Sequence, residues 1–213
     1  CDIVTFHTPL NREGIDKTFH LLNESNLSKI KPNAILINAS RGEVIDNRAL
    51  LNFMKQRDDV TLILDVWENE PRFSPELLEK VFIASPHVAG YSLEGKLNGT
   101  KIVYDALCDW MRWKKEWIPD LPLVEEDEVQ FLNSGNFEKE VNRVLTANYD
   151  PQKDTSDMKK ISLLETDERG KAFDGLRKNY SLRREFTNYK IKGVLPRGVI
   201  REGLKALGFR FLQ

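Results

Sequence analysis

Short apolar runs recur along the first half of the chain, with polar stretches between them. Each run is four to six residues long and rich in Ile, Leu and Val. Runs of this kind, bounded by turn residues, are typical of strands that are buried on both faces. They lie at Asp2–Phe6, Ala34–Asn38, Thr61–Val66 and Val81–Ala84.

Helix signals lie between and after these runs. Asp46 is placed to cap a helix over residues 48–57. Ser74, Pro75 and Glu76 give the cap, proline and acid of a second helix start. Ser92 opens a long helix that we expect to extend to about residue 114. Strands that alternate with helices predict an α/β fold with a doubly wound parallel sheet.

A polar side chain follows each predicted strand. Thr8 comes after the first strand, Arg41 after the second, residues 65–70 after the third and His87 after the fourth. The carboxyl ends of parallel strands share one edge of a sheet, which is where ligands bind in folds of this class. We therefore expect these side chains to converge there.

The pattern changes after Trp117. Pro119, Pro122 and the acidic run at 125–128 predict a linker. We therefore divide the chain into a domain at 1–117, a linker at 118–127 and a smaller α+β domain at 128–213. Within the smaller domain the pattern predicts strands at 129–132, 189–194 and 209–212, helices at 137–147, 167–185 and 198–207, and a polar loop at 148–158.

Composition narrows the class of protein. The 213 residues include 32 Lys and Arg against 33 Asp and Glu, a formal net charge of −1. This balance gives no electrostatic reason to expect a nucleic acid or a membrane surface as partner. No apolar run approaches the roughly 18 residues of a membrane span. Two cysteines without a CxxC motif predict no disulfide scaffold, no metal site and a reducing, cytoplasmic setting.

The predicted sheet is incomplete for a dinucleotide-binding domain. Such sheets have about six strands, and a GxGxxG loop follows the first one. Here four strands are predicted, and Gly90, Gly95 and Gly99 do not have the required spacing. We therefore predict a partial Rossmann-type sheet whose glycine loop lies in sequence before Cys1. A self-contained four-stranded domain is the alternative.

Four segments resemble the D-isomer-specific 2-hydroxyacid dehydrogenase family. They follow one another in the family's order, with 29 residues from Arg41 to Glu70 and 17 from Glu70 to His87. The segments are His7-Thr8-Pro9, Ile37–Leu50 (INASRGEVIDNRAL), Leu64–Pro71 (LDVWENEP) and Ser85–Gly95 (SPHVAGYSLEG).

The resemblance implies an NAD-dependent dehydrogenase in which Arg41, Glu70 and His87 are catalytic. A guanidinium binds a substrate carboxylate through two parallel hydrogen bonds, which suits Arg41. An imidazole can take the hydroxyl proton, which suits His87, and Glu70 would orient that ring.

The resemblance also implies residues for binding. Thr8, Asp65 and Gly90 would hold NAD, and Tyr91 would contact the substrate. Taken by themselves, Asp65 could cap the next turn and Tyr91 could pack at the start of the long helix.

Phe173–Phe186 and Gly90–Thr100 are similar to one branch of the family. Its members act on a small phosphorylated 2-hydroxy acid and form homodimers through an extra carboxy-terminal domain. The resemblance therefore implies the same substrate class and assembly here, with an inactive chain if the glycine loop is missing. A phosphoglycerate- or glycerate-type dehydrogenase and an NAD-sensing corepressor stay open.

For several other side chains we expect structural or solvent-exposed roles. We expect His20 to be solvated in a polar loop. The spacing of Trp110, Trp113 and Trp117 predicts packing along one helix face. A basic cluster predicts a solvated helix face or a dimer salt bridge, with a substrate phosphate as the alternative. Its members are Arg177, Lys178, Arg183 and Arg184.

Overall fold

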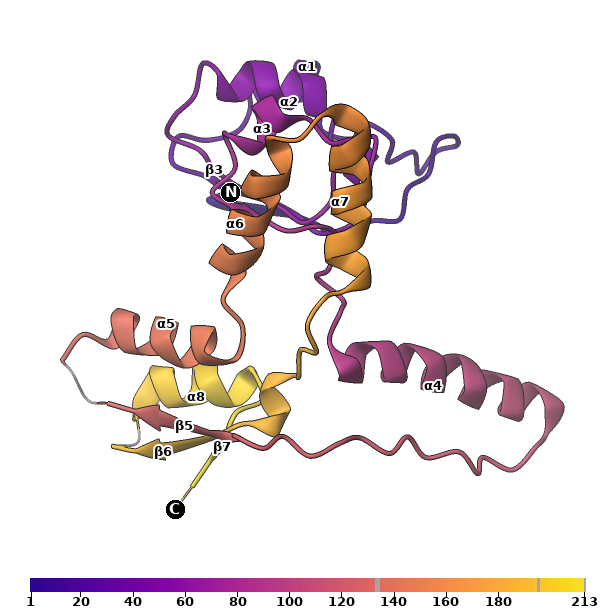
Figure 1. Ribbon diagram of the computed structural model, residues 1–213, viewed down its shortest axis with the longest axis vertical. Helices are drawn as coiled ribbons and strands as arrows, with labels where there is room; N and C mark the ends of the chain where they lie inside the picture. The colour runs from indigo at the N-terminus through magenta and orange to yellow at the C-terminus, as the bar shows by residue number, and fades with distance from the viewer. Residues whose placement is uncertain (133–134, 195, 213) are drawn as a thin grey trace. The chain divides into compact units, whose positions relative to one another are not determined.

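The computed structural model describes residues 1–132, 135–194 and 196–212 (Figure 1). The chain forms two compact units, and each unit is built from two stretches of sequence. Unit 1 contains Cys1–Ala89 and Pro151–Tyr180, and unit 2 contains Gly90–Asp150 and Ser181–Gln213. Each unit buries its own apolar cluster.

A four-stranded parallel sheet forms the centre of unit 1. Its strands lie in the order β1 (Ile3–Phe6), β2 (Ile35–Asn38), β3 (Thr61–Leu64) and β4 (Ile83–Ala84). The register pairs Phe6 with Asn38 and Asn38 with Leu64, so the carboxyl ends of the strands align. The predicted α/β fold with a parallel sheet is confirmed.

Short helices follow the strands of unit 1. The predicted caps are present, since Ala49 N donates to Asp46 Oδ1 at 2.9 Å and Leu77 N donates to Ser74 Oγ at 3.2 Å. The helices in this part of unit 1 are α1 (Glu24–Leu27), the 3₁₀ turn η1 (Gly42–Val44), α2 (Asn47–Met54) and α3 (Pro75–Leu78).

Two helices from the second half of the chain complete unit 1, α6 (Pro151–Ser162) and α7 (Thr166–Lys178). They lie side by side in Figure 1. The predicted polar loop at 148–158 is therefore wrong. Met158 is fully buried in the same core as the sheet, and Ala84 N donates to Thr155 Oγ1 at 3.0 Å. Tertiary packing of this kind stabilises a helix whose own sequence is mostly polar.

The helix predicted at 167–185 is shorter in the structure. It ends at Lys178, and Ser181–Gln213 belongs to unit 2, where Arg183 forms a bridge with Ser92. The contacts thus group the chain differently from the contiguous division at 1–117, 118–127 and 128–213. The reason is that α6 and α7 bury their apolar side chains in the core of unit 1.

Unit 2 is an α+β arrangement around a second sheet. Its three strands are parallel in the order β5 (Glu128–Phe131), β6 (Lys190–Gly193) and β7 (Arg210–Phe211). The helical elements are α4 (Leu93–Met111), α5 (Phe137–Asn148), the 3₁₀ turn η2 (Phe186–Asn188) and α8 (Gly198–Ala206).

A buried ion pair holds α4 to the segment before β6. Arg184 Nε lies 2.6 Å from Glu94 Oε1, and both side chains are almost fully buried. The prediction of a solvated face or a dimer salt bridge is therefore wrong for Arg184. The tryptophan prediction is also wrong, because α4 ends at Met111 and Trp110 is 79% exposed.

No helix in the described ranges combines the length and the apolar character needed to span a bilayer.

Candidate active site

The four strand ends of unit 1 bring the predicted catalytic residues to one edge of the sheet. At its centre, the Glu70 carboxylate lies beside the His87 ring, with Oε2 2.8 Å from Nδ1. The other carboxylate oxygen accepts a hydrogen bond from Trp67 N at 2.7 Å. A carboxylate only accepts hydrogen bonds, so Nδ1 carries the proton and Nε2 is left for proton exchange.

Asp65 holds the turn on which His87 sits. Its Oδ1 accepts hydrogen bonds from Ser85 Oγ at 2.6 Å, Val88 N at 2.8 Å and Ala89 N at 3.0 Å. This is the capping role that Asp65 suggests when it is taken by itself. Its Oδ2 receives no hydrogen bond from the residues that the structure describes, so one carboxylate oxygen can still meet a ligand.

Arg41 follows β2 and reaches the surface. Its Nη1 donates to Ser40 O at 2.7 Å, and the guanidinium is otherwise exposed. The turn that carries it is shaped by Asn38, whose Nδ2 donates to Arg41 O at 2.9 Å.

The Arg41 turn packs directly on the Glu70 loop. A Cβ atom at Gly42 would overlap the carbonyl group of Trp67, so only glycine permits this approach. Arg41 directly precedes Gly42, and Trp67 N donates a hydrogen bond to the Glu70 carboxylate. The contact between Gly42 and Trp67 therefore fixes the turn of Arg41 against the loop of Glu70.

Thr8 has an unsatisfied hydroxyl at the carboxyl end of β1. Its Oγ1 is buried and has no hydrogen-bond partner among the described residues. A buried hydroxyl without a partner is unfavourable, and a bound group at this edge would satisfy it. Thr8 and the free oxygen of Asp65 therefore fit a polar cofactor bound at these strand ends.

Gly90 and Tyr91 are the first two residues of unit 2. Lys96 Nζ lies 4.1 Å from the centre of the Tyr91 ring. Their roles toward cofactor and substrate stay predictions.

Sequence reasoning missed a cluster beside the predicted catalytic pair. His20 is not a solvated loop residue: its Nε2 lies 2.7 Å from Glu68 Oε1, and its side chain is 29% exposed. No sequence signal links these residues, because 48 positions separate them. Glu68 does fall inside the LDVWENEP segment. That segment could have drawn attention to the loop, but it gives no indication that His20 is the partner of Glu68.

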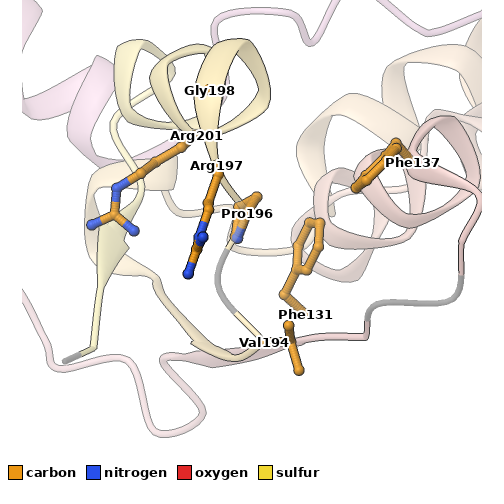
Figure 2. A pocket seen from close by; sticks show the side chains of 7 residues that line it. All are labelled: Phe131, Phe137, Val194, Pro196, Arg197, Gly198 and Arg201. Carbon is orange, nitrogen blue, oxygen red and sulfur yellow. The ribbon is translucent and has the colours of Figure 1, made fainter.

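A separate hollow lies in unit 2 and contains none of the predicted site residues (Figure 2). Its volume is about 820 Å³. Arg201 stacks on Phe211 with the guanidinium carbon 4.4 Å from the ring centre. The lining residues are Phe131, Phe137, Val194, Pro196, Arg197, Gly198 and Arg201.

Two family models match the chain. Residues 1–89 match the NAD-binding domain of D-isomer-specific 2-hydroxyacid dehydrogenases, and residues 121–208 match a domain of unknown function, DUF3410. The first match covers all the strand ends described above.

Curated relatives align with almost the whole chain. An erythronate-4-phosphate dehydrogenase of Marinobacter nauticus is 41% identical over 212 residues, covering 99% of this chain and 55% of the relative. The enzyme of the same name from Proteus mirabilis is 42% identical over 212 residues, covering 98% and 54%. The chain thus spans about half the length of the curated relatives that it matches.

Among solved structures, a glyoxylate reductase from Paecilomyes thermophila aligns with a TM-score of 0.44 and 29% identity. The alignment covers 50% of this chain and 31% of that one. The family match at the strand ends and the alignment of curated relatives with almost the whole chain agree: this chain is similar to the D-isomer-specific 2-hydroxyacid dehydrogenases.

Proposed function

We propose that the protein oxidises 4-phospho-D-erythronate at its 2-hydroxyl group with NAD, in the biosynthesis of pyridoxal 5′-phosphate. The product is the 2-oxo acid, 3-hydroxy-2-oxo-4-phosphooxybutanoate. The observation that carries the proposal is the Glu70–His87 pair at the strand ends, with Nε2 left for proton exchange. The names of the aligned relatives support this substrate.

Each residue has a distinct task in this proposal. Arg41 binds the substrate carboxylate through its guanidinium fork. The imidazole of His87 takes the proton of the 2-hydroxyl group at Nε2. Glu70 holds the ring through Nδ1 and stabilises the positive charge that the ring gains. Tyr91 contacts the rest of the substrate.

Thr8, Asp65 and Gly90 would hold the cofactor. NAD, when bound, accepts the hydride from C2 of the substrate. The buried hydroxyl of Thr8 and the free oxygen of Asp65 offer a hydrogen-bond donor and acceptor for its polar groups. We further propose a cytoplasmic homodimer that assembles through the carboxy-terminal domain.

The experiment is a turnover assay of the complete gene product with a panel of 2-hydroxy acids, with and without a terminal phosphate. We expect 4-phosphoerythronate to be preferred. Replacing His87 by Gln should lower kcat by about 10²–10⁴-fold, since general base catalysis contributes that much. Arg41→Lys should raise KM, because a lysine ammonium cannot form the paired hydrogen bonds.

Arg48→Lys is the matched control, because Arg48 is exposed on α2 and should leave both constants unchanged. Preference for 3-phosphoglycerate or for an unphosphorylated acid would reject 4-phospho-D-erythronate as the substrate and leave the proposed type of reaction unchanged. Absence of turnover with every acid, together with capture of a regulatory partner, would reject the enzyme in favour of a binding protein.

A further inference from the structure

The cluster missed by sequence reasoning is centred on Glu68, two residues before Glu70. The side chain of Glu68 is 17% exposed, and each carboxylate oxygen has its own partner. Oε1 lies 2.7 Å from His20 Nε2, and Oε2 accepts a hydrogen bond from Asn47 N at 3.0 Å. Asn47 Oδ1 in turn accepts from Glu68 N at 3.1 Å. The loop after β3 is therefore bound to the start of α2 by a reciprocal pair.

His20 is held as firmly as its partner. Its backbone N donates to Glu43 O at 2.8 Å, and its ring stacks on Phe19 with 3.9 Å between the ring centres. Its φ of 51° is in the left-handed region, which few residues other than glycine adopt. The segment after β1 is thus fixed where His20 meets Glu68.

The two ring nitrogens of His20 face two different carboxylates. Nε2 meets Glu68, and Nδ1 lies 3.7 Å from Asp46 Oδ2. Only the Glu68 contact is short enough for a hydrogen bond, and Asp46 adds a longer charge contact. The same three side chains could supply ligands to a metal ion. An ion would bind a single ring nitrogen, whereas here the carboxylates lie on opposite ones.

These contacts join the segments that carry the catalytic residues. His20 lies on the segment that begins with Thr8, Asn47 follows the turn that carries Arg41, and Glu68 lies on the loop that carries Glu70. The contact between Gly42 and Trp67 is another link between the last two segments. Glu68 is therefore the one described side chain that binds both neighbouring segments to the loop of Glu70.

We propose that Glu68 is a positioning residue: held by His20 and Asn47, it sets where Glu70 and Arg41 lie relative to each other. This inference rests on the proposed function of those two residues. Glu68 itself touches no reacting group. Its effect reaches the reaction through the orientation of the His87 ring and the placement of the Arg41 guanidinium.

The direct test is Glu68→Gln, which keeps the length of the side chain. The amide has one accepting oxygen, so it cannot serve both the His20 ring and Asn47 N. We expect kcat/KM of the complete gene product to fall by up to about 10²-fold, because a displacement near 1 Å costs that much. Both kcat and KM should change, since His87 and Arg41 are displaced together.

A spectroscopic measurement on the same protein needs no turnover. The ring ¹⁵N and proton resonances of His87 report its hydrogen bond to Glu70, and we expect Glu68→Gln to shift them. Glu76→Gln is the matched control: it removes the same charge from a surface pair with Lys55 and should leave the His87 resonances unchanged. His20→Asn, which tolerates the left-handed backbone, should repeat the shift if Glu68→Gln fails to fold.

Unchanged His87 resonances and unchanged kcat/KM in both variants would overturn the proposal. A rise in unfolding temperature on adding Zn²⁺ that is lost in Glu68→Gln would also overturn it, because the cluster would then be a metal site. If wild-type protein turns over none of the acids but Glu68→Gln still shifts the His87 resonances, the proposed reaction fails and the positioning role stands.

Discussion

The backbone of His87 lies in the left-handed region, with φ 57°. A non-glycine residue in this region is uncommon and persists only where its surroundings hold it. Here Asp65 fixes this backbone conformation through two hydrogen bonds. Its backbone O accepts one from His87 N at 2.7 Å, and its Oδ1 accepts one from Val88 N at 2.8 Å. The buried aspartate thus presents the imidazole to Glu70.

Gly42 gives a prediction at the same scale. Gly42→Ala should destabilise unit 1 by about 1–3 kcal/mol, because the new methyl group overlaps the Trp67 carbonyl and the turn must move. It should also lower turnover, since Arg41 moves with the turn. Urea unfolding followed by circular dichroism measures the first effect.

Gly99→Ala is the control for this substitution. A Cβ at Gly99 meets nothing within 4 Å, and the residue lies inside α4. There the change should be neutral or stabilising by up to about 1 kcal/mol, because alanine is the better helix former. Equal stability of the Gly42→Ala variant and the wild type would show that the turn is not constrained.

At the scale of elements, one ion pair holds the start of α4 in unit 2. Glu94 accepts hydrogen bonds from Arg184 Nε at 2.6 Å, Glu185 N at 3.0 Å and Asn188 Nδ2 at 2.8 Å. Arg184 also donates from Nη1 to Pro122 O at 2.6 Å. The pair therefore joins α4, the linker segment and η2.

This pair predicts a pH dependence of stability. Burial opposes the ionisation of Glu94, but the hydrogen bonds from Arg184 and its neighbours outweigh it, so the pKa of Glu94 lies below its usual 4.5. A carboxyl whose pKa is lowered on folding stabilises the fold above the unfolded pKa. That stability should be lost as the pH falls below about 4.5 through the folded pKa. Thermal unfolding between pH 7 and pH 3 should show this loss, and Glu94→Gln should reduce it.

Removing the arginine of the Glu94–Arg184 pair should lower the stability more than Glu94→Gln does. Arg184→Ala leaves a buried carboxylate without its cation, and we expect a loss of about 3–5 kcal/mol. Lys101→Ala is the control on the same helix, because the surface pair of Lys101 with Asp105 contributes only about 0.5 kcal/mol. Similar losses for the two variants would contradict a structural role of the buried pair.

At the scale of the whole molecule, the chain has two hydrophobic cores, and no described residue belongs to both. The core of unit 1 includes Met158 and Phe173 from α6 and α7, and the core of unit 2 is formed around Phe131 and Ile191. The chain thus leaves unit 2 after Asp150, adds the 30 residues Pro151–Tyr180 to unit 1, and returns to unit 2 at Ser181.

Assembly is the prediction that belongs to this scale. A homodimer through residues 128–213 must cover apolar surface there, and Val199 on α8 is 89% exposed. Sedimentation of the protein should give twice the chain mass, and Val199→Asp should reduce it. Ile102→Asp is the control, because Ile102 is 68% exposed on α4, outside that domain. A monomer at all concentrations would refute the dimer.

The local parts of the site could be predicted from the sequence because strand ends dictate them. Thr8, Arg41, Asp65 and His87 each lie at or within three residues of the end of an apolar run, and parallel pairing brings such residues to one edge. His20 could not be predicted, because its partner is distant in sequence and its left-handed backbone has no signature in a polar loop.

The sequence alone determined the parallel sheet, the caps of its short helices and the edge where the predicted catalytic residues meet. These follow from apolar runs and capping residues, which act over a few neighbouring positions. Only the tertiary structure decided that residues 151–178 are helices of unit 1, that Arg184 is buried and that Glu68 binds two segments at once. Such features depend on contacts between distant residues, whose free energy of burial outweighs the local preferences of the chain.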